Sequence, residues 1–134
     1  MKKLWITMMT LFSALGFMNV ADAASGYVNM EAVLASTPAF VQAGKTLAAE
    51  QQKMQQQFNE ESKKLSDKEK QALGEKLGQQ LAAKEKQLMG PIQEKLRMAI
   101  AKAAKEKGVD IVINAREVVY GGVDLTEPVK QNMK

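Results

Sequence analysis

Hydrophobic side chains recur at helical spacing through the middle of the chain, between residues 38 and 107. Helix-favouring Ala, Gln, Glu, Lys, Leu and Met dominate this stretch. Its first part has a loose heptad seam, three of whose eight members are not apolar: Phe40, Gly44, Leu47, Gln51, Met54, Phe58, Glu61 and Leu65. Its second part carries an aliphatic stripe: Leu73, Leu77, Leu81, Leu88, Ile92, Leu96 and Ile100. The pattern predicts two long amphipathic helices.

A capping signature separates the two helices. Ser66 is followed three residues later by Glu69, which is the spacing of a reciprocal cap at a helix start. We therefore predict a reversal at residues 65–66, which brings Phe58 opposite Leu77. The alternative, a single helix that continues through this point, is permitted by the helix-favouring residues on both sides.

Glycine and proline predict a soft joint near the base of the hairpin. Pro91 removes a backbone hydrogen bond and strains the preceding helical turn, and Gly90 precedes it. A reversal at residue 66 places Gly44 at the same height on the opposite helix, where it weakens that helix as well. These three residues form the predicted hinge.

Short β-strand patterns flank the hairpin on both sides. Residues 26–29 predict a strand and residues 30–35 a short helix. Thr37 and Pro38 predict the start of the long helix, with the Thr37 hydroxyl accepting from an amide of the first turn. Gly108 predicts its end, after basic residues in the last turn.

The segment after Gly108 predicts two more strands, at residues 109–114 and 117–120, with a turn between them. A final helix follows, capped by Asp124 or Thr126, with Val129 and Met133 on one face. The fold class is therefore α+β. A long antiparallel hairpin (38–107) projects from a small β body (24–37 and 108–134) that needs further cover, which oligomerisation would supply.

The first 23 residues predict an export signal. Lys2 and Lys3 precede an apolar run over residues 4–18, and Ala21 and Ala23 frame a small-residue cleavage site. We predict cleavage after Ala23. An uncleaved membrane anchor is the alternative, although the run is shorter than the ~20 residues that span a bilayer.

Composition narrows the function classes. The chain has no Cys and no His, so the commonest metal ligands, thiol nucleophiles and acid–base groups are absent, and an enzyme or a cofactor is not expected. Gly44, Lys45 and Thr46 resemble the end of a phosphate-binding loop, but Ala39 stands where that motif needs glycine.

Residues 44–107 carry net charge +5, and the rest of the chain after residue 23 carries −2. The cationic hairpin suits anionic partners. Export and a lack of stacking aromatics argue against nucleic acid.

The order of these elements resembles the Skp/OmpH family of periplasmic chaperones. The resemblance rests on Tyr27-Val28-Asn29-Met30 after the signal, on the helical hairpin, and on the block from Asp110 to Thr126. It implies a periplasmic homotrimer whose three arms surround a cavity and hold unfolded outer-membrane proteins without ATP. The arms look shorter than those of the best-known member, which implies a smaller enclosed space.

The resemblance implies a trimeric body built from the strand residues. These are Tyr27, Val28, Ile111, Ile113, Val118 and Tyr120. For Tyr120, a polar-tipped core residue is favoured over a binding residue.

Holding many unfolded sequences requires adaptable apolar contacts and a cationic surface. The apolar candidates are Met54, Leu81, Leu88, Met89 and Met98. The basic candidates are Lys53, Lys63, Lys64, Lys68, Lys76 and Lys84. The alternative for each apolar residue is that it simply joins the two helices. Two other functions stay open: an envelope adaptor for one specific partner, and a binder of anionic lipid or lipopolysaccharide.

Overall fold

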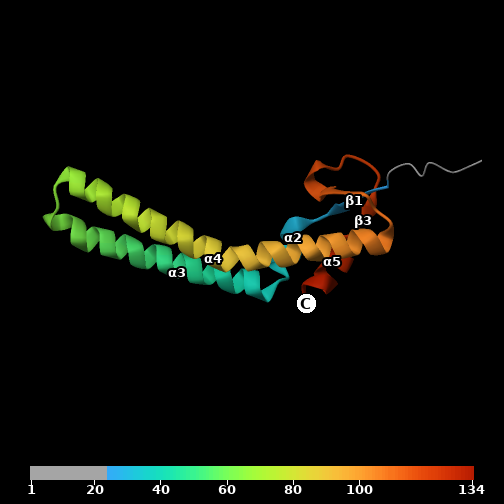
Figure 1. Cartoon of the computed structure of the whole chain (residues 1–134), viewed down its shortest axis with the longest axis horizontal. Coiled ribbons are helices and arrows are strands. Elements are labelled where there is room, and N and C mark those ends of the chain that lie inside the picture. The colour runs from blue at the N-terminus through green and yellow to red at the C-terminus, as the bar shows by residue number, and fades with distance from the viewer. Residues whose placement is uncertain (1–23) are drawn as a thin grey trace, which may run out of the picture.

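Two long helices dominate the structure, a computed structural model that describes residues 24–134. α3 (Pro38–Glu61) and α4 (Asp67–Lys107) form a hairpin, and the other elements gather around the far half of α4 (Figure 1). At 1.5 Å per residue, α4 is roughly 60 Å long and α3 roughly 36 Å, so α4 extends well beyond its partner. The predicted signal and its cleavage site lie outside the described residues. None of the helices within residues 24–134 is long and apolar enough to cross a membrane.

The turn between the helices lies where the capping signature predicts it. The Ser66 hydroxyl accepts from the Glu69 amide at 3.3 Å, and the Ser66 amide donates to Glu69 Oε2 at 2.8 Å. A single 3₁₀ turn, η1 (Ser62–Lys64), precedes it, and Leu65 is extended. The reversal is confirmed, and the alternative of one continuous helix is wrong, because the extended residues before α4 end the first helix.

α4 continues through Gly90 and Pro91 without a break. Figure 1 shows it changing direction where its colour passes from yellow to orange, the stretch of the colour bar around residue 90. Proline removes one helical hydrogen bond and disfavours the helical conformation of the residue before it, partly through that residue's Cβ. Gly90 has no Cβ, so it lets the helix continue into Pro91.

The end of α4 is a glycine cap. Gly108 has φ +64°, in the left-handed region, and the Val109 amide donates to the Ala104 carbonyl at 2.9 Å. This is the pattern of a Schellman motif, which satisfies carbonyls that the helix leaves free. The predicted stop is confirmed.

The start of α3 differs from the expectation in one detail. Pro38 is the first helical residue, as predicted, but Thr37 makes no side-chain cap. Its buried hydroxyl donates instead to the Val33 carbonyl at 2.8 Å. The reason is the neighbouring helix α2 (Met30–Ala35), whose last carbonyls lie directly before Thr37 and need donors.

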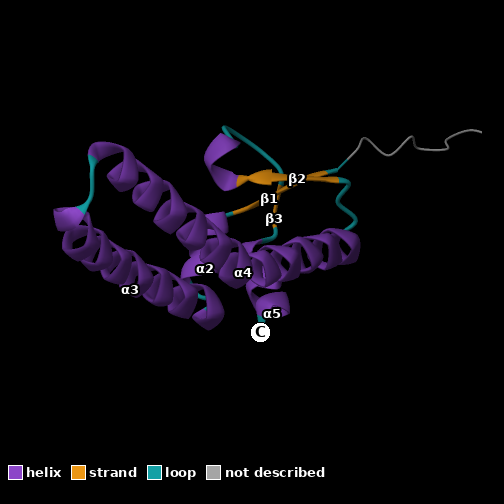
Figure 2. Cartoon of the chain, turned by 60° about the vertical axis from the view of Figure 1, so that its left-hand side comes forward, coloured by secondary structure: helices purple, strands orange, loops and turns teal. Residues whose placement is uncertain are grey.

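A small parallel sheet lies beside the far half of α4. β1 (Ser25–Val28) is the central strand, with β2 (Ile111–Asn114) on one side and β3 (Val123–Asp124) on the other. Both outer strands are parallel to β1. Figure 2 shows the strands above α4, with the segment that follows β2 arching over them.

The prediction of a strand at residues 117–120 is wrong. Residues Ala115–Glu117 form the 3₁₀ helix η2, and the third strand is β3, which begins at Val123. Because β2 and β3 lie on opposite sides of β1 and run the same way, the connection must return along the sheet before β3 begins. Residues 115–122 are used in that return. The other predicted strands shift only at their ends.

α5 (Thr126–Met133) completes the body by packing against α4 on the same side of the sheet. The predicted cap at Asp124 or Thr126 is wrong, because Leu125 is the N-cap residue and makes no side-chain cap bond. Asp124 Oδ1 accepts from the Thr126 amide at 2.9 Å, a local bond just before the helix. The Thr126 hydroxyl accepts from the Asn29 amide at 3.0 Å and thereby joins α5 to the start of α2. Val129 and Met133 are both buried, as their predicted common face requires.

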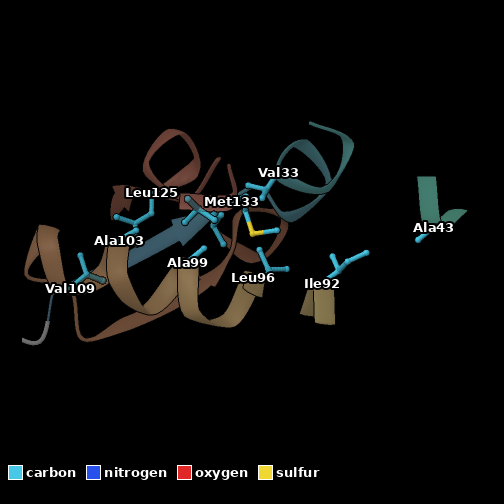
Figure 3. Close-up of a cluster of buried hydrophobic side chains, with 11 residues drawn as sticks. Val33, Ala43, Ile92, Leu96, Ala99, Ala103, Val109, Leu125 and Met133 are labelled. Atoms are coloured by element: carbon cyan, nitrogen blue, oxygen red, sulfur yellow. The ribbon is translucent and has the colours of Figure 1, made fainter. Parts of the chain in front are cut away.

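The buried hydrophobic core joins α4 to these smaller elements and to Ala43 of α3. Figure 3 shows Leu96, Ala99 and Ala103 following one another along α4, with Leu125 and Met133 across from them. Gly26 in β1 allows the close approach: a Cβ there would lie 2.9 Å from Val109 Cγ1. α4 therefore contributes to two structures, the hairpin through its first half and the body core through its second.

Candidate functional site

The apolar seam of the hairpin is incompletely closed near its tip. Met54 and Phe58 come from α3, and Leu77 and Leu81 come from α4. Leu77 is buried, but the other three side chains are only half-buried. Between them lies an open groove of about 310 Å³. The predicted client-binding residues Met54 and Leu81 are thus brought together, and they both join the helices and face solvent.

The remaining apolar candidates lie farther along α4. Leu88 and Met89 are half-buried and pack against the body core. Met98 points outward, with 60% of its surface exposed. These residues therefore do not form one patch with Met54 and Leu81, but they place apolar surface along much of the arm.

The predicted basic residues lie on the arm surface. Lys53, Lys63, Lys64, Lys68 and Lys76 are exposed, and Lys84 is half-buried. Within residues 24–134 the ion pairs are Glu94 with Arg97, Glu31 with Arg116, and Glu127 with Lys130. None involves the six predicted lysines, so their charge is available to an anionic partner.

The pKa shifts resolved within residues 24–134 come from hydrogen bonds at the surface. The Arg97 guanidinium donates to Glu94 at 2.7 and 3.1 Å, which lowers the pKa of that exposed carboxyl. The Ser66 amide, and then its hydroxyl, lower the pKa of Glu69. Residues 24–134 contain no cluster of three or more potential metal-ligating side chains. Gly44, Lys45 and Thr46 lie inside α3, where the backbone amides are used by the helix.

One face of the sheet is open and apolar. Ile111 and Ile113 of β2 are 53% and 42% exposed, and Tyr27 pairs with Ile113 on the same face. The segment from residue 115 to residue 122 overhangs this face and leaves a hollow of about 440 Å³. Val28 points the other way, into the core, with 2% of its surface exposed.

The overhanging segment carries the most exposed hydrophobic residues in the described chain. Tyr120 is 98% exposed and Val119 is fully exposed, so the expectation of a core position for Tyr120 is wrong in the single chain. An exposed ion pair joins Arg116, at the start of the segment, to Glu31, and Gly121 and Gly122 have positive φ at its end. Its exposure arises because residues 115–122 form the return connection and not a paired strand.

The sequence interpretation did not single out Gly74, Gly78 and Val119. Gly74 and Gly78 line the groove between the helices, and Val119 accompanies Tyr120 at the overhang. A spacing of four between two glycines on one helix, opposite Phe58, was the available signal for the groove. Nothing local marks Val119, because its exposure depends on the path of the crossing segment.

The comparison with protein families decides the class of this protein. Residues 67–133 match the family described as outer membrane protein, OmpH-like. The protein is a member of the OmpH-like family. The match covers half of the chain and runs from the start of α4 through β2, β3 and α5, whereas α3 lies outside it. OmpH-like proteins are periplasmic chaperones, not enzymes, so membership points to a chaperone-like role in the periplasm. No curated protein matches this chain.

Proposed function

We propose that this OmpH-like protein is an ATP-independent periplasmic holdase that binds unfolded outer-membrane proteins between the arms of a homotrimer. The family match carries the proposal. The arm adds support, because it combines a half-buried apolar seam with lysines outside the ion pairs of the described chain. In this proposal residues 1–23 are an export signal cleaved after Ala23, residues 38–107 form the arm, and residues 24–37 and 108–134 form the body.

The open sheet face supports assembly through the body. Tyr27, Ile111 and Ile113 lie beside the overhang that carries Val118 and Tyr120. A three-stranded sheet needs cover on an exposed apolar face, and copies of the same chain would supply it. Val28 supports this surface indirectly, because its buried side chain anchors β1 to the core of its own chain.

The arm would hold clients through weak and adaptable contacts. Thioether and aliphatic side chains adjust to many partners, which suits Met54, Leu81, Leu88, Met89 and Met98. The six lysines would raise encounter rates with acidic segments: Lys53, Lys63, Lys64, Lys68, Lys76 and Lys84. Bending at Gly44, Gly90 and Pro91 would let the arms fit clients of different size.

Suppression of aggregation tests this function. An outer-membrane β-barrel protein unfolded in urea is diluted into buffer with the purified protein and without ATP, and light scattering is followed. We expect the protein to slow aggregation when its trimer is in excess over the client, with a serum albumin control showing no effect. The holdase function is wrong if aggregation proceeds at the rate of the control.

The free lysines also favour a second function, the binding of anionic lipid or lipopolysaccharide. Vesicles with and without anionic lipid separate the two. A lipid binder would bind only anionic vesicles, and its binding would weaken as the salt concentration rises. Met54→Ser would leave that binding unchanged. A holdase would suppress aggregation less well with Met54→Ser and show little preference between vesicles.

A further inference from the structure

The net positive charge of the hairpin is concentrated in the second half of α4. Residues 50–85, which form the outer part of the arm, contain seven basic and seven acidic residues, so their charges balance. Residues 86–107 contain six basic and two acidic residues, which gives this stretch a net charge of +4. The cationic surface therefore lies where α4 passes the body, and not near the hairpin tip.

Three of these lysines share one exposed side of the helix. Lys102 follows Lys95 by seven residues and precedes Lys105 by three, and Met98 lies between the first two. Side chains at spacings of three, four and seven lie along one side of a helix. The three lysines are exposed and belong to none of the ion pairs of the described chain, and Met98 is 60% exposed. These four residues are called the basic row below.

A hollow of about 350 Å³ adjoins the basic row at the end nearest the arm. It lies where the start of α3 and the end of α5 come close to α4 (Figure 1). A cavity of about 150 Å³ holds a benzene-sized group, so this hollow has room for one large apolar side chain. Its lining contains two lysines and no acidic residue: Thr37, Pro38, Ala39, Ile92, Lys95, Met133 and Lys134. Because Lys95 belongs to both the hollow and the row, one ligand can contact both.

The borders of the basic row select a narrow ligand. Glu94 lies on one border, where Arg97 already pairs with it, and Glu106 lies on the other, four residues after Lys102. These carboxylates would repel a broad anionic surface such as a membrane, whereas a single chain segment can lie between them. The exposed Met98 adds an adaptable apolar contact, which suits a protein ligand. An acidic protein segment is therefore favoured over a lipid surface.

We propose that the basic row and the adjoining hollow bind an acidic segment of a partner protein. A large apolar side chain of the segment enters the hollow, and its carboxylates lie beside Lys95, Lys102 and Lys105. The inference goes beyond the proposed function, because the surface would serve a folded partner as well as an unfolded client. Exposed charge pairs of this kind speed association and weaken as the salt concentration rises.

Fluorescence anisotropy of a labelled peptide tests this surface on the purified protein. In the peptide, one leucine precedes a stretch of alternating glutamate and serine. We expect the peptide to bind, and its binding to weaken as salt is added. A peptide with serine in place of the leucine should bind about tenfold more weakly, because it leaves the hollow empty. Equal binding of the two peptides would overturn the role of the hollow.

Two pairs of substitutions separate the basic row from total charge. Lys95→Gln with Lys102→Gln removes two charges from the row. Lys86→Gln with Lys107→Gln removes two charges from other sides of the same half of α4, where Lys86 lines a different hollow. All four lysines are exposed, so circular dichroism should not change.

The row pair should weaken peptide binding about tenfold, and the control pair should bind as the parent does. Equal weakening by both pairs would overturn the proposal, because total charge alone would then attract the peptide. Binding of the parent to phosphatidylglycerol vesicles but not to the peptide would overturn it as well, since the row would then be a lipid-binding surface.

Discussion

At the scale of single residues, Ser66 and Glu69 define where the hairpin turns. The Ser66 hydroxyl and the Glu69 carboxylate each accept a backbone hydrogen bond from the other residue's amide. These bonds satisfy two amides that a helix start leaves free, and they place a negative charge at the positive end of the helix dipole. Both groups are exposed, so the cap fixes the position of the turn more than it stabilises the whole fold.

The cap gives the hairpin tip a pH dependence of known sign. The Ser66 amide lowers the pKa of Glu69 from its ordinary value of 4.5 in the folded chain. A depressed folded pKa means that the stabilisation is complete above pH 4.5 and is lost as pH falls through the lower, folded value. Glu69→Gln should remove this dependence. NMR titration of the Glu69 side chain and of the Ser66 amide would measure it, and an unshifted Glu69 pKa would contradict the prediction.

At the scale of elements, α4 carries the connection between arm and body. Its first half packs against α3, and its second half packs against α5 and the sheet. Pro91 lies inside the helix, between the half-buried seam of the arm and the buried residues Leu96 and Ala99. The missing hydrogen bond at Pro91 therefore falls at the junction, where a bend changes the direction of the arm relative to the body.

Replacement of Pro91 by alanine should straighten and stiffen this junction. Restoring the helical hydrogen bond favours the straight helix by up to about 3 kcal/mol. The chain has no cysteine, so spin labels on cysteines introduced at Glu60 and Glu106 report one tip-to-body distance. In samples diluted with unlabelled protein, Pro91→Ala should narrow and shift the distance distribution.

Gln93→Ala, at an exposed position on the same helix, provides the matched control. It changes no backbone hydrogen bond, so its distance distribution should equal that of the parent. Identical distributions for Pro91→Ala and Gln93→Ala would show that the joint at this level is not set by proline.

At the scale of the whole molecule, the single chain leaves one side of its body uncovered. α4 and α5 cover one face of the sheet, while the other face carries exposed isoleucines and the overhang with Val119 and Tyr120. Exposed apolar side chains grouped in one place are typical of an interaction surface. The proposed trimer would bury this surface and set three arms around a common axis.

Light scattering on the purified protein tests the assembly. The parent should have the mass of a trimer, and the double substitution Val119→Ser and Tyr120→Ser should shift the mass toward the monomer. Circular dichroism should stay unchanged, because neither side chain is buried in the single chain. Val41→Ser, which alters an exposed hydrophobic residue on α3, should leave the mass as it is. A monomeric parent, or an unchanged mass after the double substitution, would remove this surface from the assembly.

The sequence by itself determined the elements whose signals are local. The hairpin turn follows from Ser66 and Glu69, the end of α4 from Gly108, and the buried face of α5 from Val129 and Met133. Each depends on hydrogen bonds or side-chain spacing within a few residues, so the pattern is sufficient. The pairing of the two long helices also followed, because the turn position fixes which residues face each other.

Only the tertiary structure decided where the third strand lies and what the arm leaves open. A strand is defined by the strand that it pairs with. β1 pairs with residues 123–124, because the preceding eight residues are needed for the chain to return along the sheet. That path leaves Tyr120 exposed, although the sequence pattern of residues 117–120 predicts a strand. The groove at Gly74 and Gly78 likewise depends on what the facing helix fails to supply, which no local pattern records.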